Sequence, residues 1–134
     1  MLTYLWIAIG GALGSVGRYW LNGVVSARFG ETFPMGTIAV NVAGSFVIGV
    51  LAALTVAEGR MGAEARGFTT QFLMIGVCGG FTTFSSFSLQ TLNLAQDGEW
   101  FYAGLNILGS VALCLIAVWL GHLAAFGLNS IKGG

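Results

Sequence analysis

The stretch CGGFTTFSSFSLQ, from Cys78 to Gln90, places weak helix formers inside a long apolar segment. It contains two glycines, two threonines and three serines, and every third residue from Phe81 to Phe87 is a phenylalanine. The segment around it, Gly67–Gln96, has no charged side chain. Because glycine and hydroxyl-bearing residues weaken a helix, we predict that a helix runs through this segment and unwinds in mid-span at Gly79, Gly80 and the threonine and serine run that follows them.

The composition indicates a protein that folds in lipid. The chain has 134 residues, of which 56% are hydrophobic and 7% are charged. A soluble domain has about 25% charged residues, so this chain lacks the charge to cover a water-facing surface. Its five basic and five acidic residues cancel. No basic patch is available to hold nucleic acid, and we expect no nucleic-acid partner.

The charged residues separate four apolar segments, each near the roughly 20 residues that cross a bilayer as a helix. The predicted spans are residues 2–20, 36–57, 68–94 and 101–126. We therefore predict an all-α membrane protein with a single transmembrane domain over residues 1–134 and a third helix broken in mid-membrane. A signal peptide is the alternative for the first span. It is disfavoured because the span lacks a basic start and three more spans follow.

The basic residues give almost no orientation signal. Four spans would place Arg60, Arg66 and Lys132 on one side of the membrane, and Arg18 and Arg28 on the other. The positive-inside rule orients a protein by this difference, which is three against two. Two interpretations follow: the chain inserts both ways and forms an antiparallel dimer, or it takes one orientation fixed by local cues.

Polar residues recur every four positions in two of the predicted spans. They are Tyr102, Asn106, Ser110 and Cys114 in the fourth span, and Thr37, Asn41, Ser45 and Gly49 in the second. Residues four apart share a helix face. Such stripes either hydrogen-bond to neighbouring helices or line a pathway for a small ion. They contain no acid or base, which disfavours a proton-coupled carrier.

Three motifs together resemble the Fluc (CrcB) family of fluoride channels over essentially the whole chain. They are Gly10–Gly14 followed by Arg18, Gly36-Thr37 followed by Asn41 and Gly44, and Cys78–Ser88. The resemblance implies a channel, not an enzyme, that exports fluoride passively through the bacterial inner membrane. It also implies an antiparallel, dual-topology homodimer with two pores and a structural Na⁺ ion at the dimer interface.

The resemblance carries over to individual residues. It assigns the backbone carbonyls of Gly79 and Thr82 to sodium, and Arg18 to an aqueous vestibule. It assigns the pore to Phe84, Phe87, Asn41, Thr37, Tyr102, Asn106, Ser110 and Cys114, with Ser85, Ser86 and Ser88 flanking the phenylalanines. Many relatives carry a glutamate where this chain has Gln90. A neutral amide does not titrate, so this position carries no charge in this chain.

Two other functions match the length and span number. A small dual-topology multidrug exporter would need a carboxylate within the membrane, whereas every acid of this chain is expected in a loop. A non-transporting membrane assembly factor would use the polar stripes only to join helices. Neither alternative explains the motif from Cys78 to Ser88.

Overall fold

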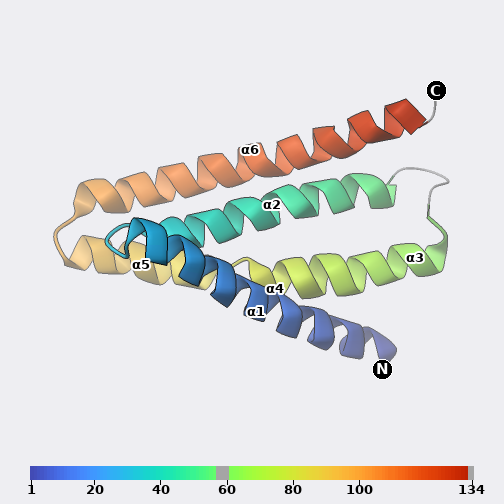
Figure 1. Cartoon of the computed structure of the whole chain (residues 1–134), viewed down its shortest axis with the longest axis horizontal. Coiled ribbons are helices and arrows are strands. Elements are labelled where there is room, and N and C mark those ends of the chain that lie inside the picture. Colours follow the sequence, from blue (N-terminus) through green and yellow to red (C-terminus); the bar gives the residue numbers. More distant parts are fainter. Residues whose placement is uncertain (57–60, 133–134) are drawn as a thin grey trace.

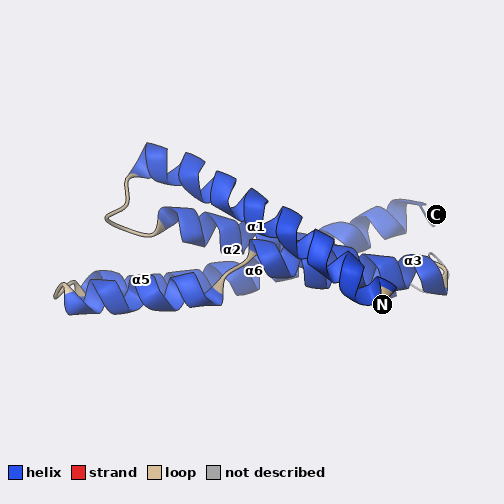
Figure 2. Cartoon of the chain, turned by 90° about the horizontal axis from the view of Figure 1, so that it is seen from below, coloured by secondary structure: helices blue, strands red, loops and turns tan. Residues whose placement is uncertain are grey.

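The structure is a computed structural model that describes residues 1–56 and 61–132. Its elements are α1 (Leu2–Phe29), α2 (Met35–Val56), α3 (Ala63–Phe68), the π-helix η1 (Thr69–Cys78), α4 (Gly79–Phe81), α5 (Phe84–Gln96) and α6 (Trp100–Lys132). The described residues form no strand (Figure 2). The prediction of an all-α fold is therefore confirmed. The end of the second predicted span, at Ala57, and the loop residues Glu58 and Arg60 lie outside the described residues.

Three described helical segments are long and apolar enough to cross a membrane. They are Met35–Val56, Ala63–Gln96 and Trp100–Ile131. The helix α1 is not among them, and it carries Arg18 and Arg28 along its second half. It continues to Phe29, well past the predicted end of the first span at residue 20. The start of α1 and the end of α6 lie at the same end of the bundle (Figure 1).

Glycines bring α2 and α6 into close contact along their length. These two helices pack together more extensively than any other pair of elements. A Cβ atom on Gly49 would overlap the carbonyl oxygen of Val118, and one on Gly121 would overlap the carbonyl oxygen of Phe46. The two backbones therefore touch because neither glycine carries a side chain.

A second close contact joins α1 to η1 and α4. A Cβ atom on Gly10 would overlap the carbonyl oxygen of Phe72, and one on Gly14 would overlap that of Val77. Gly10 and Gly14, at the two ends of the Gly10–Gly14 motif, thus lie on the face of α1 that meets η1. Gly80 of α4 also lies close to α1, since its Cβ would be 2.5 Å from the carbonyl oxygen of Gly11.

The helical run is interrupted at Thr82 and Thr83, in the threonine part of the stretch predicted to unwind. Gly79 and Gly80 belong to α4. Thr82 has φ −78° and ψ 155°, and Thr83 has φ −150° and ψ 110°, so both are extended. The physical reason is packing: Gly80 serves the contact with α1, while the threonines provide the hydroxyls that cap the helices on either side.

The α1 contact predicts opposite effects for one substitution at two nearby glycines. Alanine at position 14 would overlap the Val77 carbonyl, whereas a Cβ on Gly11 meets no atom within 4 Å. We expect Gly14→Ala to lower stability by about 1–3 kcal/mol through overpacking. Gly11→Ala should raise it by about 0.4–1 kcal/mol because alanine restricts the unfolded chain. Thermal unfolding in detergent measures both, and equal melting temperatures for the two variants would contradict the contact.

Candidate functional site

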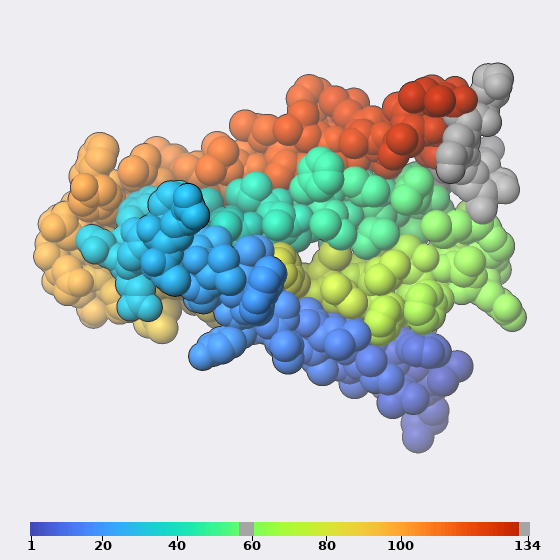
Figure 3. Space-filling model, viewed as in Figure 1, coloured from blue at the N-terminus to red at the C-terminus, as the bar shows by residue number. Residues whose placement is uncertain are grey.

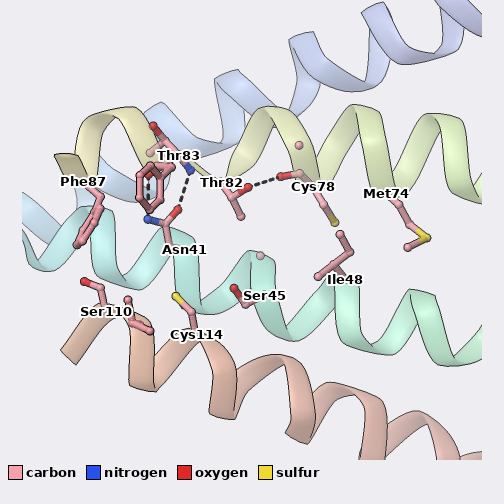
Figure 4. Close-up of a pocket in the computed structure, with 14 residues that line it drawn as sticks. Asn41, Ser45, Ile48, Met74, Cys78, Thr82, Thr83, Phe87, Ser110 and Cys114 are labelled. Carbon is pink, nitrogen blue, oxygen red and sulfur yellow. Dashed lines mark hydrogen bonds between the residues drawn. The ribbon is translucent and has the colours of Figure 1, made fainter. Parts of the chain in front are cut away.

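The side chain of Asn41 in α2 holds the backbone of the interruption. Its Nδ2 donates to the carbonyl oxygen of Thr83 at 3.0 Å, and its Oδ1 accepts from the Thr83 backbone N–H at 2.7 Å. Thr83 is buried, and a buried backbone group without a partner is costly. Asn41 therefore supplies both hydrogen bonds that the extended backbone of Thr83 cannot make within a helix (Figure 4).

The Thr83 side chain starts the next helix. Its Oγ1 accepts from the backbone N–H of Ser86 at 3.2 Å, which is the hydrogen bond of a helix N-cap. The same hydroxyl donates to Ser86 Oγ at 3.1 Å and lies 3.3 Å from Ser85 Oγ. On the other side of the interruption, the Thr82 hydroxyl donates to the carbonyl oxygen of Cys78 at 2.9 Å. Hydroxyls thus close the helix ends on both sides.

A cavity of about 330 Å³ lies beside the interruption, between α2, η1 and α6. Figure 3 shows a hollow between α2 and η1 on the face that it displays. The lining residues are Asn41, Gly44, Ser45, Ile48, Met74, Cys78, Gly79, Thr82, Thr83, Phe84, Phe87, Ser110, Val111 and Cys114. None of them is charged, so this break cavity offers only neutral polar groups and apolar surface.

A second cavity of about 260 Å³ lies between α1, α2 and α5. Its lining is more polar and includes the positively charged side chain of Arg18. Its lining residues are Ser15, Arg18, Tyr19, Asn22, Thr37, Val40, Thr83, Ser86 and Gln90. Thr83 lines both this Arg18 cavity and the break cavity. Thr83, whose backbone is held by Asn41, therefore lies where the two cavities approach each other.

The predicted phenylalanine pair has two different environments in the chain. The rings of Phe84 and Phe87 lie 5.2 Å apart between centroids, at 50° to each other. Phe87 is 8% exposed, whereas Phe84 is 76% exposed, and both line the break cavity. Phe87 is thus packed within the chain, whereas the ring of Phe84 is left largely uncovered by the described residues.

Some of the polar residues in the predicted stripe on α6 pack between helices, and others line the break cavity. Asn106, 1% exposed, donates through Nδ2 to the hydroxyl of Thr91 at 2.9 Å, and it accepts from Ser110 Oγ at 3.1 Å. Thr91 in turn donates to the carbonyl oxygen of Phe87 at 2.8 Å. This series of hydrogen bonds joins α6 to α5. Of the stripe, only Ser110 and Cys114 line the break cavity.

The remaining predicted site residues lie in several places. Tyr102 is 41% exposed and packs against the ring of Phe33, at 5.9 Å between centroids. Ser85 and Ser88 are exposed, and the Ser88 hydroxyl donates to the carbonyl oxygen of Phe84 within α5. On α2, Thr37 lines the Arg18 cavity and Asn41 the break cavity, whereas Gly49 serves the contact with α6.

The carbonyl oxygens assigned to sodium are free of backbone partners. The hydrogen bonds found at the interruption use the carbonyls of Cys78 and Thr83, and none of them uses that of Gly79 or Thr82. Gly79 is exposed, and both residues line the break cavity. Unpaired main-chain carbonyls beside an interrupted helix are ligands that Na⁺ accepts, so these two residues fit such an ion.

Comparison with known proteins identifies the family. Residues 5–122 match the family model described as CrcB-like protein, Camphor Resistance (CrcB). The chain belongs to the CrcB family. A protein of Opitutus terrae named fluoride-specific ion channel FluC is 65% identical over 133 residues, which are 99% of each chain. The FluC of Paramagnetospirillum magneticum is 57% identical over 96% of this chain and 99% of its own, and that of Geobacter sulfurreducens is 51% identical over 93% and 98%.

This CrcB chain also gathers polar residues that the sequence motifs did not single out. Thr83 was part of the opening motif but had no assigned role, although its hydroxyl and backbone organise the interruption. Asn22 and Gln90 meet at the Arg18 cavity, and the buried Oε1 of Gln90 has no hydrogen-bond partner within the described chain. Asn22 shares a face of α1 with Ser15, Arg18 and Ser26, at spacings of three and four residues, and this polar pattern could have pointed to it.

We call the two hydrogen bonds between the Asn41 side chain and the Thr83 backbone the Asn41 clamp. Removing the amide should lower the stability of this CrcB protein. Asn41→Leu keeps the side-chain size but leaves the N–H and the carbonyl of Thr83 without partners, at about 1–3 kcal/mol for each group. We expect a lower melting temperature in detergent. Ser45→Ala is the matched control, because Ser45 lines the same cavity one turn later without a hydrogen bond that holds the interruption. Equal melting of both variants would show that the clamp is dispensable.

Proposed function

We propose that this chain forms a fluoride-selective channel that lets cytoplasmic fluoride leave passively and so lowers its toxicity. The observation that carries the proposal is its 65% identity, over almost its entire length, to a protein named fluoride-specific ion channel. A multidrug exporter is disfavoured because the described acids avoid the helix interiors. Glu31, Asp97 and Glu99 lie between helices, and Glu64 lies in the first turn of α3 rather than in a loop.

The chemistry of the two cavities suits fluoride. The ion is small and strongly hydrated, so groups in the protein must replace the water it loses. Both Asn41 hydrogen bonds to Thr83 fix the amide, which leaves its second N–H as a donor for the anion. The positive edges of the Phe84 and Phe87 rings add further contacts. These groups are neutral, so they hold the ion weakly enough for release.

Arg18 supplies the attraction at the entrance. Among the residues that the structure describes, it is the only charged one that lines the Arg18 cavity. A cation in a recessed polar space raises the local concentration of anions. We therefore assign this cavity to the vestibule, with Thr37, Ser86 and Thr83 leading from it toward the break cavity.

In the membrane, we propose four crossings: α1, α2, the interrupted run Ala63–Gln96, and α6. The site of the interruption is then at membrane depth in the bacterial inner membrane. Extended backbone is tolerated there only where protein or a cavity surrounds it. The Asn41 clamp, which pairs the Thr83 backbone inside the subunit, supports this arrangement.

The active unit is proposed to be an antiparallel homodimer. Phe84 is 76% exposed in the single chain although it lines the break cavity beside the clamped Thr83. A polar interruption facing lipid would be costly, and a second copy would cover it. The near balance of basic residues on the two sides lets both orientations insert.

A structural Na⁺ ion at the dimer interface completes the proposal. The exposed Gly79 carbonyl and the Thr82 carbonyl would hold it, each without a competing hydrogen bond. The ion would supply positive charge that makes the protein interior less hostile to a passing anion. Emission spectrometry on the purified protein, exchanged into potassium buffer, tests this: full fluoride flux without retained sodium would exclude the ion.

Liposomes containing the purified chain should release fluoride without any proton gradient. A fluoride electrode measures the efflux, and protein-free liposomes give the background. Efflux at background level would overturn the proposed function. A second arm uses Phe84→Ile, which nearly keeps the apolar volume but removes the ring edge. A folded Phe84→Ile protein with strongly reduced flux would support contact between ring and ion, whereas an unchanged flux would assign the ring to packing.

The antiparallel dimer predicts that a chain locked in one orientation is inactive alone. Gly62→Lys with Ala65→Lys adds two positive charges at exposed positions on one side, which should fix that side in the cytoplasm. Ala27→Lys with Thr32→Lys does the same at exposed positions on the other side. We expect little fluoride efflux from cells expressing either variant alone and recovery when both are expressed together. Full activity of one locked variant alone would contradict the dimer.

A further inference from the structure

A third cavity lies near one end of the bundle and shares lining residues with the Arg18 cavity. It has a volume of about 300 Å³ and lies where the α1–α2 connection approaches the end of α5. Its polar lining includes Asn22, Ser26, Glu31, Gln90, Asn93 and Asp97. Asn22 and Gln90 line both cavities. An ion that approaches Arg18 through this space therefore passes two carboxylates first.

Within the described chain, no cation forms a salt bridge with either carboxylate. Glu31 and Asp97 are both exposed, and neither makes a salt bridge or a side-chain hydrogen bond to a described residue. Arg28 lies nearby in sequence, in the last turn of α1, but it lines neither this cavity nor the Arg18 cavity. The negative charge at this mouth is therefore available to act on ions in the water-filled space.

Helix stability does not account for Asp97. It follows the last residue of α5 as the C-cap, where the partial negative charge of the helix end disfavours a carboxylate. Glu31 lies outside α1 and α2, so it serves no helix end directly. Two carboxylates that stabilise no described element thus face the approach to an anion-attracting arginine.

We propose that Glu31 and Asp97 act as an electrostatic brake on fluoride entry. This proposal rests on the proposed channel function. In that channel, the two carboxylates oppose the attraction of Arg18 and lower the fluoride concentration at this mouth. They act through their charge at a distance and need bind nothing. Repulsion between exposed charges reaches about 30 Å at 0.01 M salt but only about 3 Å at 1 M. The brake should therefore weaken as ionic strength rises.

The test compares fluoride efflux from liposomes at low and high ionic strength. The double variant Glu31→Gln with Asp97→Asn removes both charges at nearly constant size. We expect its initial flux to exceed that of the unaltered chain about two- to five-fold near 0.01 M salt, and to match it near 1 M salt. The matched control exchanges the two acids, Glu31→Asp with Asp97→Glu, which preserves both charges and should leave the flux unchanged.

Each outcome decides between the brake and another role. An unchanged or reduced flux in the double variant at low salt would overturn the brake, provided that gel filtration shows a correctly sized protein. An equal increase at both salt concentrations would also overturn it, because a wider mouth would explain that result without charge. If the double variant does not assemble correctly, Glu31→Gln and Asp97→Asn are tested one at a time. Each should then increase the fluoride flux by a smaller amount, and that increase should also disappear at high salt. Background efflux from the unaltered chain would instead refute the channel function itself, and the brake with it.

Discussion

Two hydrogen bonds between the Asn41 side chain and the Thr83 backbone are the constraint on which the interrupted helix depends. A chain that leaves the helix for two residues releases backbone groups that need partners. Asn41 pairs those of Thr83 from a neighbouring helix, and the Thr83 hydroxyl then caps α5. This arrangement fixes the direction in which α5 restarts. The position of Phe84 and Phe87 beside the break cavity follows from that direction.

Glycine contacts make the clamp possible because they bring the helices close enough for a short side chain to reach. Gly49 and Gly121 join α2 to α6, while Gly14 and Gly80 join α1 to the run that precedes the interruption. A Cβ on Gly44 would overlap the Thr82 methyl group, so α2 also touches the interruption directly. Larger side chains at these positions would separate the helices. The same small residues thus determine both the packing and the site.

The three cavities differ in the charge of the residues that line them. Two carboxylates line the outer cavity, Arg18 lines the next, and the break cavity has no charged residue. For the proposed fluoride channel, this order separates three tasks. The outer charges would limit entry, the arginine would attract the anion, and the neutral amide and ring edges would replace its water. A charged ligand in the last space would hold the ion too tightly for rapid release.

The sequence by itself determined the helical class, the membrane character and the family, because these depend on composition, on charge-free length and on a motif of adjacent residues. It also located the interruption to within a few positions. The tertiary structure decided the rest, because a stripe of residues four apart defines a helix face without naming its neighbour. Asn106 and Ser110 share a face, yet Asn106 is satisfied inside the subunit by Thr91, and only Ser110 reaches the cavity. The glycines and the threonines of the motif are both weak helix formers, and the packing of Gly80 against α1 decides that the threonines are the residues that leave the helix. Arg18, Thr37 and Gln90 are distant in sequence, and only the packing of α1, α2 and α5 brings them to one cavity.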